Sequence, residues 1–447
     1  MLAHKEQTMK ESNTVEVIII GGGYAGLSAS YYLRQYGISH TILERGQVGQ
    51  SWVSQRWDSF RLNTASKLNT LPGFDCGENE KNAFCSAQSL VSSMQDFVKM
   101  HELPIRQNVM VTRVEKDPQN NSFVVTALEN GTICTFHCKQ VIIASGSQSQ
   151  KKVPSLASAI QTGIRQMHSS EYRSAAGLPE GGVLVVGSGQ SGCQICEDLI
   201  SAGRKVYLST SKVPRCPRHY RGRDIIDWLI LSGFFETRLD QLPDPAMRKL
   251  RTPLLKGTDG GRASLSLQAL ARKGVKLFGR VENVSEYIVT FCDDAQTNLR
   301  FGDEFSERVK EMIDGFIKET NIHAPVATPD VDDEPVKPED ILNNETWVDL
   351  KAYHISCIIW ATGFTSDFSY LKIPVLDISG SPIHHAGLSA VEGVYFLGLH
   401  WQRSRKSDIL FGLKDDARFI TDNIYCKLKG KLAPAAEPGP TIRGILY

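Results

Sequence analysis

The sequence predicts an α/β fold made of two Rossmann-like domains, and three observations support this. Short apolar runs that suit parallel strands buried on both faces lead directly into glycine clusters at residues 21–26 and 187–192. Each cluster is followed by helix-forming residues and then by another apolar strand, which makes a βαβ unit. The second unit repeats the first near the middle of the chain.

The elements follow in order along the chain. The first unit is predicted as a strand, a helix and a strand over residues 17–20, 25–36 and 40–43. Further strands are expected at 123–127 and 141–144, and the second unit repeats strand, helix and strand at 182–186, 193–201 and 205–208. Residues 321–338, rich in Pro and Asp, predict a surface connection. Later strands at 355–361 and 393–399 and a helix at 413–428 predict that the chain then returns to its first domain.

These elements divide the chain into three segments. The length of 447 residues agrees with two or three domains, because single cores stop growing well below that size. We expect a first domain over 1–178, a second domain with an insertion over 179–345, and the remainder of the first domain over 346–447. The sequence does not determine the oligomeric state, and a homodimer is one alternative.

Composition and charge exclude several classes of protein. Hydrophobic residues make up 41% of the chain and charged residues 22%, as in folded globular proteins. Fifty Lys and Arg balance 49 Asp and Glu, so no net charge attracts nucleic acid or an anionic membrane. The first residues lack the apolar core of a signal peptide, and no apolar run reaches the roughly 20 residues of a membrane span. The sequence predicts a cytoplasmic protein with no nucleic-acid or membrane partner.

Ten cysteines are scattered through the chain, which is typical of reduced thiols in a reducing compartment. The CxxC pair of Cys193 and Cys196 falls within the helix predicted after the second glycine cluster. It has two interpretations, a redox pair or helix packing. No group of His and Cys has the spacing of a zinc site, so no metal is predicted.

The first glycine cluster predicts a dinucleotide site. Gly21 allows a tight turn, Gly23 lets a pyrophosphate approach the backbone, and Gly26 allows close packing of helix on strand. The helix N-terminus then offers free N–H groups to the phosphates, with Tyr24 and Ala25 in its first turn. Glu44, followed by Arg45, lies about twenty residues on, where a carboxylate binds ribose hydroxyls and repels a 2′-phosphate. The site therefore suits FAD or NAD, whereas a plainer interpretation is a turn that only links strand and helix.

The second cluster repeats the phosphate cradle without the acid. Its residues are Gly187, Ser188, Gly189, Gln190, Ser191 and Gly192. In place of the carboxylate stand Ser209, Lys212 and Arg215, and hydroxyls with cations favour a 2′-phosphate, hence NADPH over NADH. Four arginines lie within residues 215–223. They have two interpretations, a clamp for NADPH or an anionic substrate, or a solvated loop paired with local acids.

Several stretches resemble the class B flavin-dependent monooxygenases, which include flavin-containing monooxygenases, Baeyer-Villiger enzymes and plant indole-pyruvate enzymes. These stretches are residues 49–52, Asn63 with Thr64 and Lys67, residues 360–364, and residues 398–403, the last of which resemble a bacterial branch of the family. The resemblance implies a glutathione-reductase-like arrangement that binds FAD in the first domain and NADPH in the second. It implies FAD contacts at Ser51, Trp52, Val111, Gly146 and Leu399, NADPH contacts at Thr362 and Gly363, and a catalytic Asn63 near the reactive edge of the flavin.

The resemblance also implies a reaction. NADPH reduces FAD, dioxygen adds to give a peroxyflavin, and one oxygen atom passes to a small organic substrate. The family's histidine motif between the two clusters is only loosely kept at Gln161, Gly163 and His168, which favours oxygenation at nitrogen or sulfur over Baeyer-Villiger or keto-acid chemistry. His168 itself has a hydrogen-bonding and a packing interpretation. The same two nucleotide sites would also suit a flavin reductase, an NADPH oxidase, or a disulfide reductase with a cysteine pair against the flavin.

Overall fold

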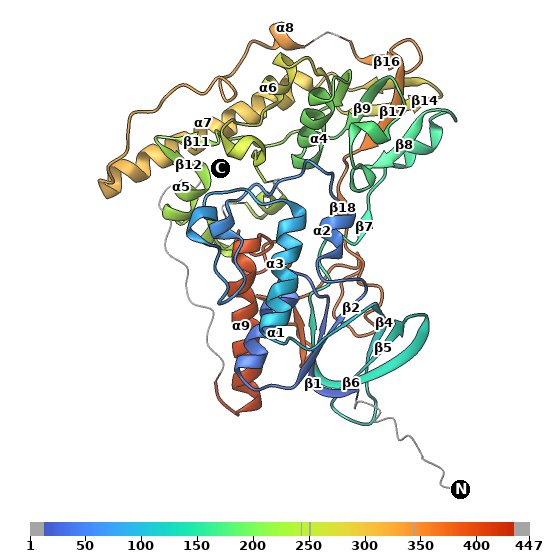
Figure 1. The fold of residues 1–447 in the computed structure, drawn as a ribbon, viewed down its shortest axis with the longest axis vertical. Helices are drawn as coiled ribbons and strands as arrows, with labels where there is room; N and C mark the ends of the chain where they lie inside the picture. The colour runs from blue at the N-terminus through green and yellow to red at the C-terminus, as the bar shows by residue number, and fades with distance from the viewer. Residues whose placement is uncertain (1–12, 243, 250–251, 343–344, 433–447) are drawn as a thin grey trace.

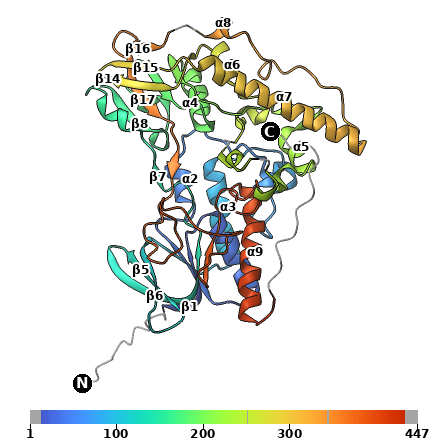
Figure 2. The ribbon, with the colours of Figure 1, turned by 180° about the vertical axis from the view of Figure 1, so that it is seen from behind.

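The computed structural model describes residues 13–242, 244–249, 252–342 and 345–432. The ends of the predicted first and third segments, at residues 1 and 447, lie outside this range. Two bodies, each built on its own sheet, lie one above the other along the long axis (Figures 1 and 2). This arrangement is the predicted two-domain α/β fold.

The first sheet has the strand order β3-β2-β1-β6-β5-β4, with β19 also paired to β6. Neighbours among β1, β2, β3, β6 and β19 run parallel, whereas β4, β5 and β6 are antiparallel. Its strands are β1 (Thr14–Ile20), β2 (His40–Glu44), β3 (Ile105–Gln107), β4 (Val109–Lys116), β5 (Phe123–Glu129), β6 (Thr132–Ile143) and β19 (Val394–Phe396). Residues 17–20 of β1 are buried because the strand lies between β2 and β6 and both faces are covered.

Helices cover one face of this sheet. They are α1 (Tyr24–Gln35), α3 (Ala87–Met100) and α9 (Leu410–Leu428), and α9, red in Figure 1, lies beside α1. Leu33, Phe97 and Ile420 join these helices to the sheet in one core cluster. The closing helix α9 therefore packs against α1 on the first sheet.

The second sheet is parallel throughout and has the order β13-β10-β9-β17-β8. Its strands are β8 (Arg165–His168), β9 (Gly182–Val186), β10 (Val206–Ser209), β13 (Lys276–Phe278) and β17 (Ile355–Trp360). The predicted boundaries at 179 and 346 are therefore wrong for two strands, since β8 precedes and β17 follows the range 179–345. A strand as apolar as β17 fits the middle of either sheet, and its sequence does not reveal which sheet it joins.

The remaining elements are smaller or lie at the periphery. The ribbon of β7 (Gln150–Lys151) and β18 (Phe364–Thr365) lies where the two bodies meet (Figure 1). Other strands are β11 (His219–Tyr220), β12 (Arg223–Asp224), β14 (Val281–Ser285), β15 (Ile288–Phe291) and β16 (Trp347–Asp349). Other helices are α2 (Gln50–Ser54), α4 (Gln190–Ser201), α5 (Ile225–Leu231), α6 (Leu267–Arg272), α7 (Ala295–Thr320) and α8 (Pro338–Ile341).

Most predicted elements are present, with differences at their ends. Strand β6 begins at Thr132, well before the predicted 141, because its first half pairs with β5 and alternates between exposed and buried side chains. Helices α4 and α9 each begin three residues before their predicted starts. Between residues 321 and 337 the chain forms neither helix nor strand, as predicted. Within the described residues, every helix is too short or too polar to cross a membrane.

Candidate active site

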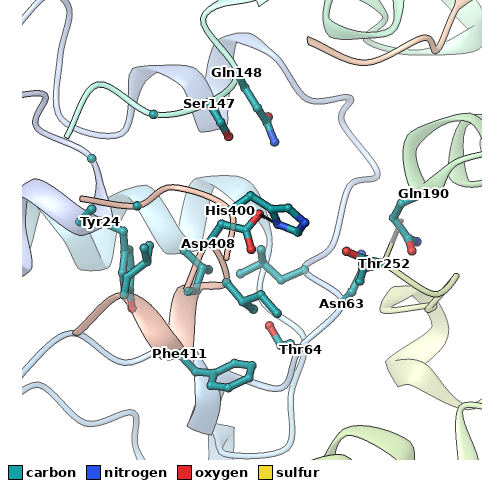
Figure 3. Close-up of a pocket in the computed structure, with 18 of the residues that line it drawn as sticks. Tyr24, Asn63, Thr64, Ser147, Gln148, Gln190, Thr252, His400, Asp408 and Phe411 are labelled. Carbon is teal, nitrogen blue, oxygen red and sulfur yellow. Dashed lines mark hydrogen bonds and ion pairs between the residues drawn. The ribbon is translucent and has the colours of Figure 1, made fainter. Parts of the chain in front are cut away.

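A cavity of about 520 Å³ lies at the ends of both glycine clusters. Gly23, Tyr24 and Ala25 of the first cluster line it, and so does Gln190 of the second. In Figure 3, Tyr24 lies on one side of the cavity and Gln190, Asn63 and Thr252 on the other, with His400 and Asp408 between them. Residues from two clusters far apart in the sequence thus line one space.

The first cluster has the shape of a phosphate cradle. Gly21 has a φ of +109°, and a Cβ there would lie closer than 3.0 Å to the Ala144 carbonyl. A Cβ on Gly26 would overlap the Gly21 carbonyl in the same way. In contrast, a Cβ on Gly23 would meet no atom within 4 Å, so this position faces open space. Because α1 starts after Gly23 without a side-chain cap, its first N–H groups are available to a phosphate.

The Glu44 carboxylate lies beside this cluster at the end of β2. Oε2 accepts a hydrogen bond from the Gly22 N–H at 2.7 Å, and Oε1 accepts one from the Gly46 N–H at 2.8 Å. A carboxylate has about four lone-pair sites, so acceptor capacity remains for ribose hydroxyls. The neighbouring Arg45 is exposed and lines the cavity.

The second cluster repeats this geometry. A Cβ on Gly187 would lie 2.6 Å from the Ala361 carbonyl, and one on Gly192 would overlap Gly187. Helix α4 starts after Gly189, again without a side-chain cap. Gln190 accepts a hydrogen bond from the Leu255 N–H at 2.9 Å and donates one to the Leu255 carbonyl, which fixes the segment around Leu255 against the cluster.

Two of the residues predicted to bind the 2′-phosphate have other partners. Ser209 is buried, and its hydroxyl donates to the Gly279 carbonyl at 3.0 Å and accepts from the Val281 N–H at 3.1 Å. Arg215 is buried as well, and its guanidinium is paired with Asp303 and Asp333. The predicted phosphate roles of Ser209 and Arg215 are therefore wrong, because both side chains are buried and bonded to other groups of the protein.

Lys212 is exposed in the loop that follows β10, three residues after the strand ends at Ser209. Nearby, Ser188 accepts a hydrogen bond from the Ser211 N–H at 2.9 Å, so its hydroxyl supports the loop. Ser191 is half-buried in the first turn of α4. Of the three residues that replace the missing acid, Lys212 is the one whose charge is open to solvent.

The arginine-rich run is mainly a set of internal ion pairs. Arg218 is buried, pairs with Asp224, and donates to the Asn63 carbonyl at 2.7 Å. Arg221 pairs with Asp314 at 2.6 Å. The run is therefore better described as arginines paired with acids than as a ligand clamp, although two of these arginines, Arg215 and Arg218, are buried instead of solvated.

Asn63 lines the cavity and its amide has a defined orientation. Its Oδ1 accepts a hydrogen bond from Nε2 of Gln194 at 2.8 Å, an assignment that follows from the hydrogen-bond network. Arg218 holds its backbone carbonyl. Because the acceptor is used internally, the amide N–H₂ is the group that a ligand would meet. Ser51 and Trp52, also predicted at this site, line the same cavity, and so does Gly146.

Four other predicted residues, Val111, Leu399, Thr362 and Gly363, lie outside the cavity lining. Val111 is half-buried in β4. Leu399 packs against a core cluster that includes Ile18 and Phe396, and its N–H donates to Gln402 at 3.3 Å. Gly398, His400 and the first turn of α9 line the cavity in place of Leu399. Thr362 donates to the Lys152 carbonyl, which places it in the linker between the two bodies.

His168 anchors this linker. Its Nδ1 accepts from the Ser170 N–H at 3.2 Å, so Nε2 carries the proton and donates to the Gly363 carbonyl at 2.9 Å. Burial lowers the pKa of His168, which keeps this neutral form. The ring also packs edge-on against Phe364. Both interpretations of His168 therefore apply, since it makes specific hydrogen bonds and fills the interior.

The sequence interpretation missed the pair of His400 and Asp408. Nδ1 of His400 lies 2.7 Å from Oδ2 of Asp408, and Nε2 lies 3.0 Å from the Arg248 carbonyl (Figure 3). Both ring nitrogens face acceptors, an arrangement that favours the protonated ring because both nitrogens then donate. Burial lowers the pKa of His400, but the hydrogen bond and charge of Asp408 outweigh it and the net pKa is raised. No sequence motif joins His400 to Arg248, which lies 152 residues away.

The cysteine pair is structural. Cys193 and Cys196 are free thiols with no exposed surface on the inner side of α4. Burial raises the pKa of both thiols, and a neutral buried thiol is a poor nucleophile. The redox interpretation of the CxxC pair is therefore not supported.

Comparisons with known proteins agree with this architecture. Residues 18–231 match the pyridine nucleotide-disulphide oxidoreductase family. The chain is 30% identical over 408 residues to "Uncharacterized oxidoreductase CzcO" of Bacillus subtilis (strain 168), an alignment that covers 91% of this chain and 97% of the relative. The chain belongs to the CzcO family of oxidoreductases. This CzcO-family chain is also 31% identical over 214 residues to "Probable indole-3-pyruvate monooxygenase YUCCA10" of Arabidopsis thaliana, covering 47% of the chain and 54% of the relative.

The fold of the CzcO-family chain is similar to that of the flavin-containing monooxygenase from Stenotrophomonas maltophilia. The TM-score is 0.63 at 19% sequence identity, with 93% of this chain and 99% of the other covered. This similarity confirms the predicted fold class. Together with the relatives, it also confirms the predicted resemblance to class B flavin-dependent monooxygenases.

Proposed function

We propose that the chain is an FAD- and NADPH-dependent monooxygenase that transfers one oxygen atom of dioxygen to nitrogen or sulfur of a small organic substrate. The observation that carries the proposal is that one cavity is lined by the uncapped start of α1 after the first glycine cluster and by Gln190 at the uncapped start of α4 in the second. The relatives that are named as monooxygenases support the reaction class. A bound flavin, once reduced by NADPH, would supply the oxygen chemistry.

The residues present fit the two nucleotides. The open space at Gly23 and the Glu44 carboxylate suit FAD at the first cluster, with Ser51 and Trp52 beside it. Gly187 and Gly192 shape the second cradle for NADPH. Residues 209–212, which end β10 and follow it, include no acid that would repel the 2′-phosphate, and Lys212 offers a positive charge there. Val111, Thr362 and Gly363 remain proposed nucleotide contacts through the linker and the sheet edge.

The protein's own groups would bind and orient the reactants. Asn63 offers an oriented amide N–H₂ to a polar oxygen in the cavity. An apolar wall of the cavity includes side chains from α5, α7 and α9, which would exclude water. Its members are Ile226, Leu229, Phe234, Phe235, Leu255, Phe305 and Phe411. This wall suits a substrate with an apolar body.

The reaction products separate this proposal from Baeyer-Villiger chemistry and from an NADPH oxidase. The test is to supply the FAD-loaded protein with NADPH, isotopically labelled dioxygen and a panel of amines, sulfides and ketones, and to identify products by mass spectrometry. The proposal expects one labelled oxygen atom in an N-oxide or S-oxide. Labelled lactones or esters from ketones alone would favour Baeyer-Villiger chemistry, whereas peroxide without labelled product would favour an NADPH oxidase.

An Asn63→Ala variant tests the catalytic assignment in the same assay. The variant should retain FAD but form less labelled product per NADPH consumed, because a donor to the developing oxygen centre is lost. Asn120→Ala serves as the control, since Asn120 lies on an exposed turn. An Asn63→Ala protein with unchanged product yield and rate would contradict the assignment.

A further inference from the structure

Arg56 is a cavity residue that neither glycine cluster accounts for. It follows α2 and lines the cavity together with Ser51, Trp52 and Gln148. Its Nη1 donates to the Gln55 carbonyl at 3.0 Å, and its Nη2 donates to Oε1 of Gln148 at 3.3 Å. Both acceptors are neutral. A guanidinium has five N–H donors, so most of its hydrogen-bonding capacity stays available to a ligand.

The charge of Arg56 has no counterion within the described part of the chain, where no carboxylate approaches it to within 4.0 Å. The rings of Trp52 and Phe60 lie 5.1 and 5.5 Å from the guanidinium carbon, and their faces offset only part of a desolvated charge. Burial lowers the pKa of Arg56 to about 10 and is its only cause, which agrees with the lack of a nearby acid. The side chain still carries its charge at neutral pH.

Two buried arginines elsewhere in the chain show the contrast. Arg215 is paired with Asp303 and Asp333, and Arg218 with Asp224. The interior thus supplies a carboxylate to each of these charges, as the high cost of an unpaired buried ion requires. Arg56 is instead directed to a cavity, where a ligand can supply the missing charge.

We propose that Arg56 binds the anionic group of a second ligand that enters the cavity after FAD. This ligand is either the nicotinamide nucleotide, through a phosphate, or the substrate, through a carboxylate. The planar guanidinium can form paired hydrogen bonds with either kind of oxygen group. The inference rests on the proposed function and adds to it a specific anion site.

The test measures ligand binding by FAD-loaded protein, without turnover. Wild-type protein and an Arg56→Gln variant are titrated with NADP⁺, with benzoate and with its neutral analogue benzamide, and the dissociation constants are taken from the flavin absorbance change or from calorimetry. Arg61→Gln is the matched control, since Arg61 belongs to the same loop but does not line the cavity. An Arg56→Lys variant, which keeps the charge but lacks the planar guanidinium, is measured in parallel. It replaces the Gln variant as the test if Arg56→Gln does not fold.

The inference expects Arg56→Gln to raise the dissociation constant of NADP⁺ or of benzoate at least tenfold. Arg56→Lys should lie between Gln and wild type, and Arg61→Gln and benzamide should show no change. A change for NADP⁺ alone identifies the phosphate as the ligand group, and a change for benzoate alone identifies the carboxylate. Unchanged constants for both anions would overturn the inference, as would a folded Arg56→Gln protein that loses FAD. Wild-type protein that binds neither FAD nor NADP⁺ would instead contradict the proposed function itself.

Discussion

Replacing Gly23 by alanine should separate cofactor binding from folding. The added Cβ meets no protein atom within 4 Å, and the φ of −80° suits any L-residue. The free energy of unfolding of the apo-protein should therefore stay within about 0.5 kcal/mol of wild type. The same methyl group occupies the space proposed for the FAD pyrophosphate, so FAD affinity should fall at least tenfold.

The magnitude follows from ligand linkage. FAD at 100 times its dissociation constant stabilises a protein by about 2.7 kcal/mol, and tenfold weaker binding at the same concentration reduces this to about 1.4 kcal/mol. Gly26→Ala is the contrasting variant, because its Cβ would overlap the Gly21 carbonyl. It should destabilise the apo-protein itself by about 1–3 kcal/mol or more.

Denaturant unfolding of each protein, with and without FAD, measures both effects. The reasoning predicts a smaller FAD-dependent increment for Gly23→Ala and a lower stability without FAD for Gly26→Ala. An increment for Gly23→Ala equal to that of wild type would refute the assignment of FAD to the first cluster. A Gly26→Ala apo-protein as stable as wild type would refute the packing argument.

Further predictions concern residues outside the first cluster. Lys212→Ala should raise the Michaelis constant for NADPH about tenfold more than that for NADH, because a charge-assisted contact contributes roughly 1.5–3 kcal/mol; equal effects on both nucleotides would contradict it. Arg215→Ala should lower the free energy of unfolding by about 3–5 kcal/mol, since it leaves buried carboxylates unpaired, and steady-state kinetics on the folded fraction should show no selective loss of NADPH. Cys193→Ser should leave NADPH-dependent reduction of a disulfide dye unchanged. Loss of this dye reduction in the variant would support the disulfide-reductase interpretation. Burial raises the pKa of Asp416 from 3.8 to about 7. The protonated side chain, which stabilises the folded state, is therefore lost as the pH rises through 7. The free energy of unfolding of Asp416→Asn should increase relative to that of wild type between pH 4 and 7, and a constant difference would contradict this.

The nucleotide cradles could be predicted from sequence because their geometry is local. Gly21, Gly23 and Gly26 belong to one turn and the helix that follows it, and Glu44 ends the adjacent strand. Each requirement, a tight turn, open space and a helix start, concerns residues near one another in the chain. The structure shows these features at the predicted positions, apart from shifts at helix ends.

The residues whose roles were wrongly predicted or missed are those whose partners are distant in sequence. Arg215 has the expected spacing for a phosphate ligand, but Asp303 and Asp333, 88 and 118 residues away, pair with it instead. The hydrogen bonding of the His400 ring likewise depends on the Arg248 carbonyl, which is 152 residues away. Arg56 follows the predicted flavin-side residues, yet only the assembled cavity shows that no carboxylate of the described residues pairs with it. Strand β17 shows the same limit for the fold, since its apolar side chains do not specify which sheet it joins.

In the proposed function, one cavity brings FAD and NADPH together from two separate cradles. The most direct measurement is an anaerobic titration of FAD-loaded protein with NADPH, with the oxidised flavin absorbance as the readout. We expect loss of that absorbance as one equivalent of NADPH is added, and a much weaker response to NADH. A chain that does not take up FAD, or whose bound flavin stays oxidised with excess NADPH, would contradict it.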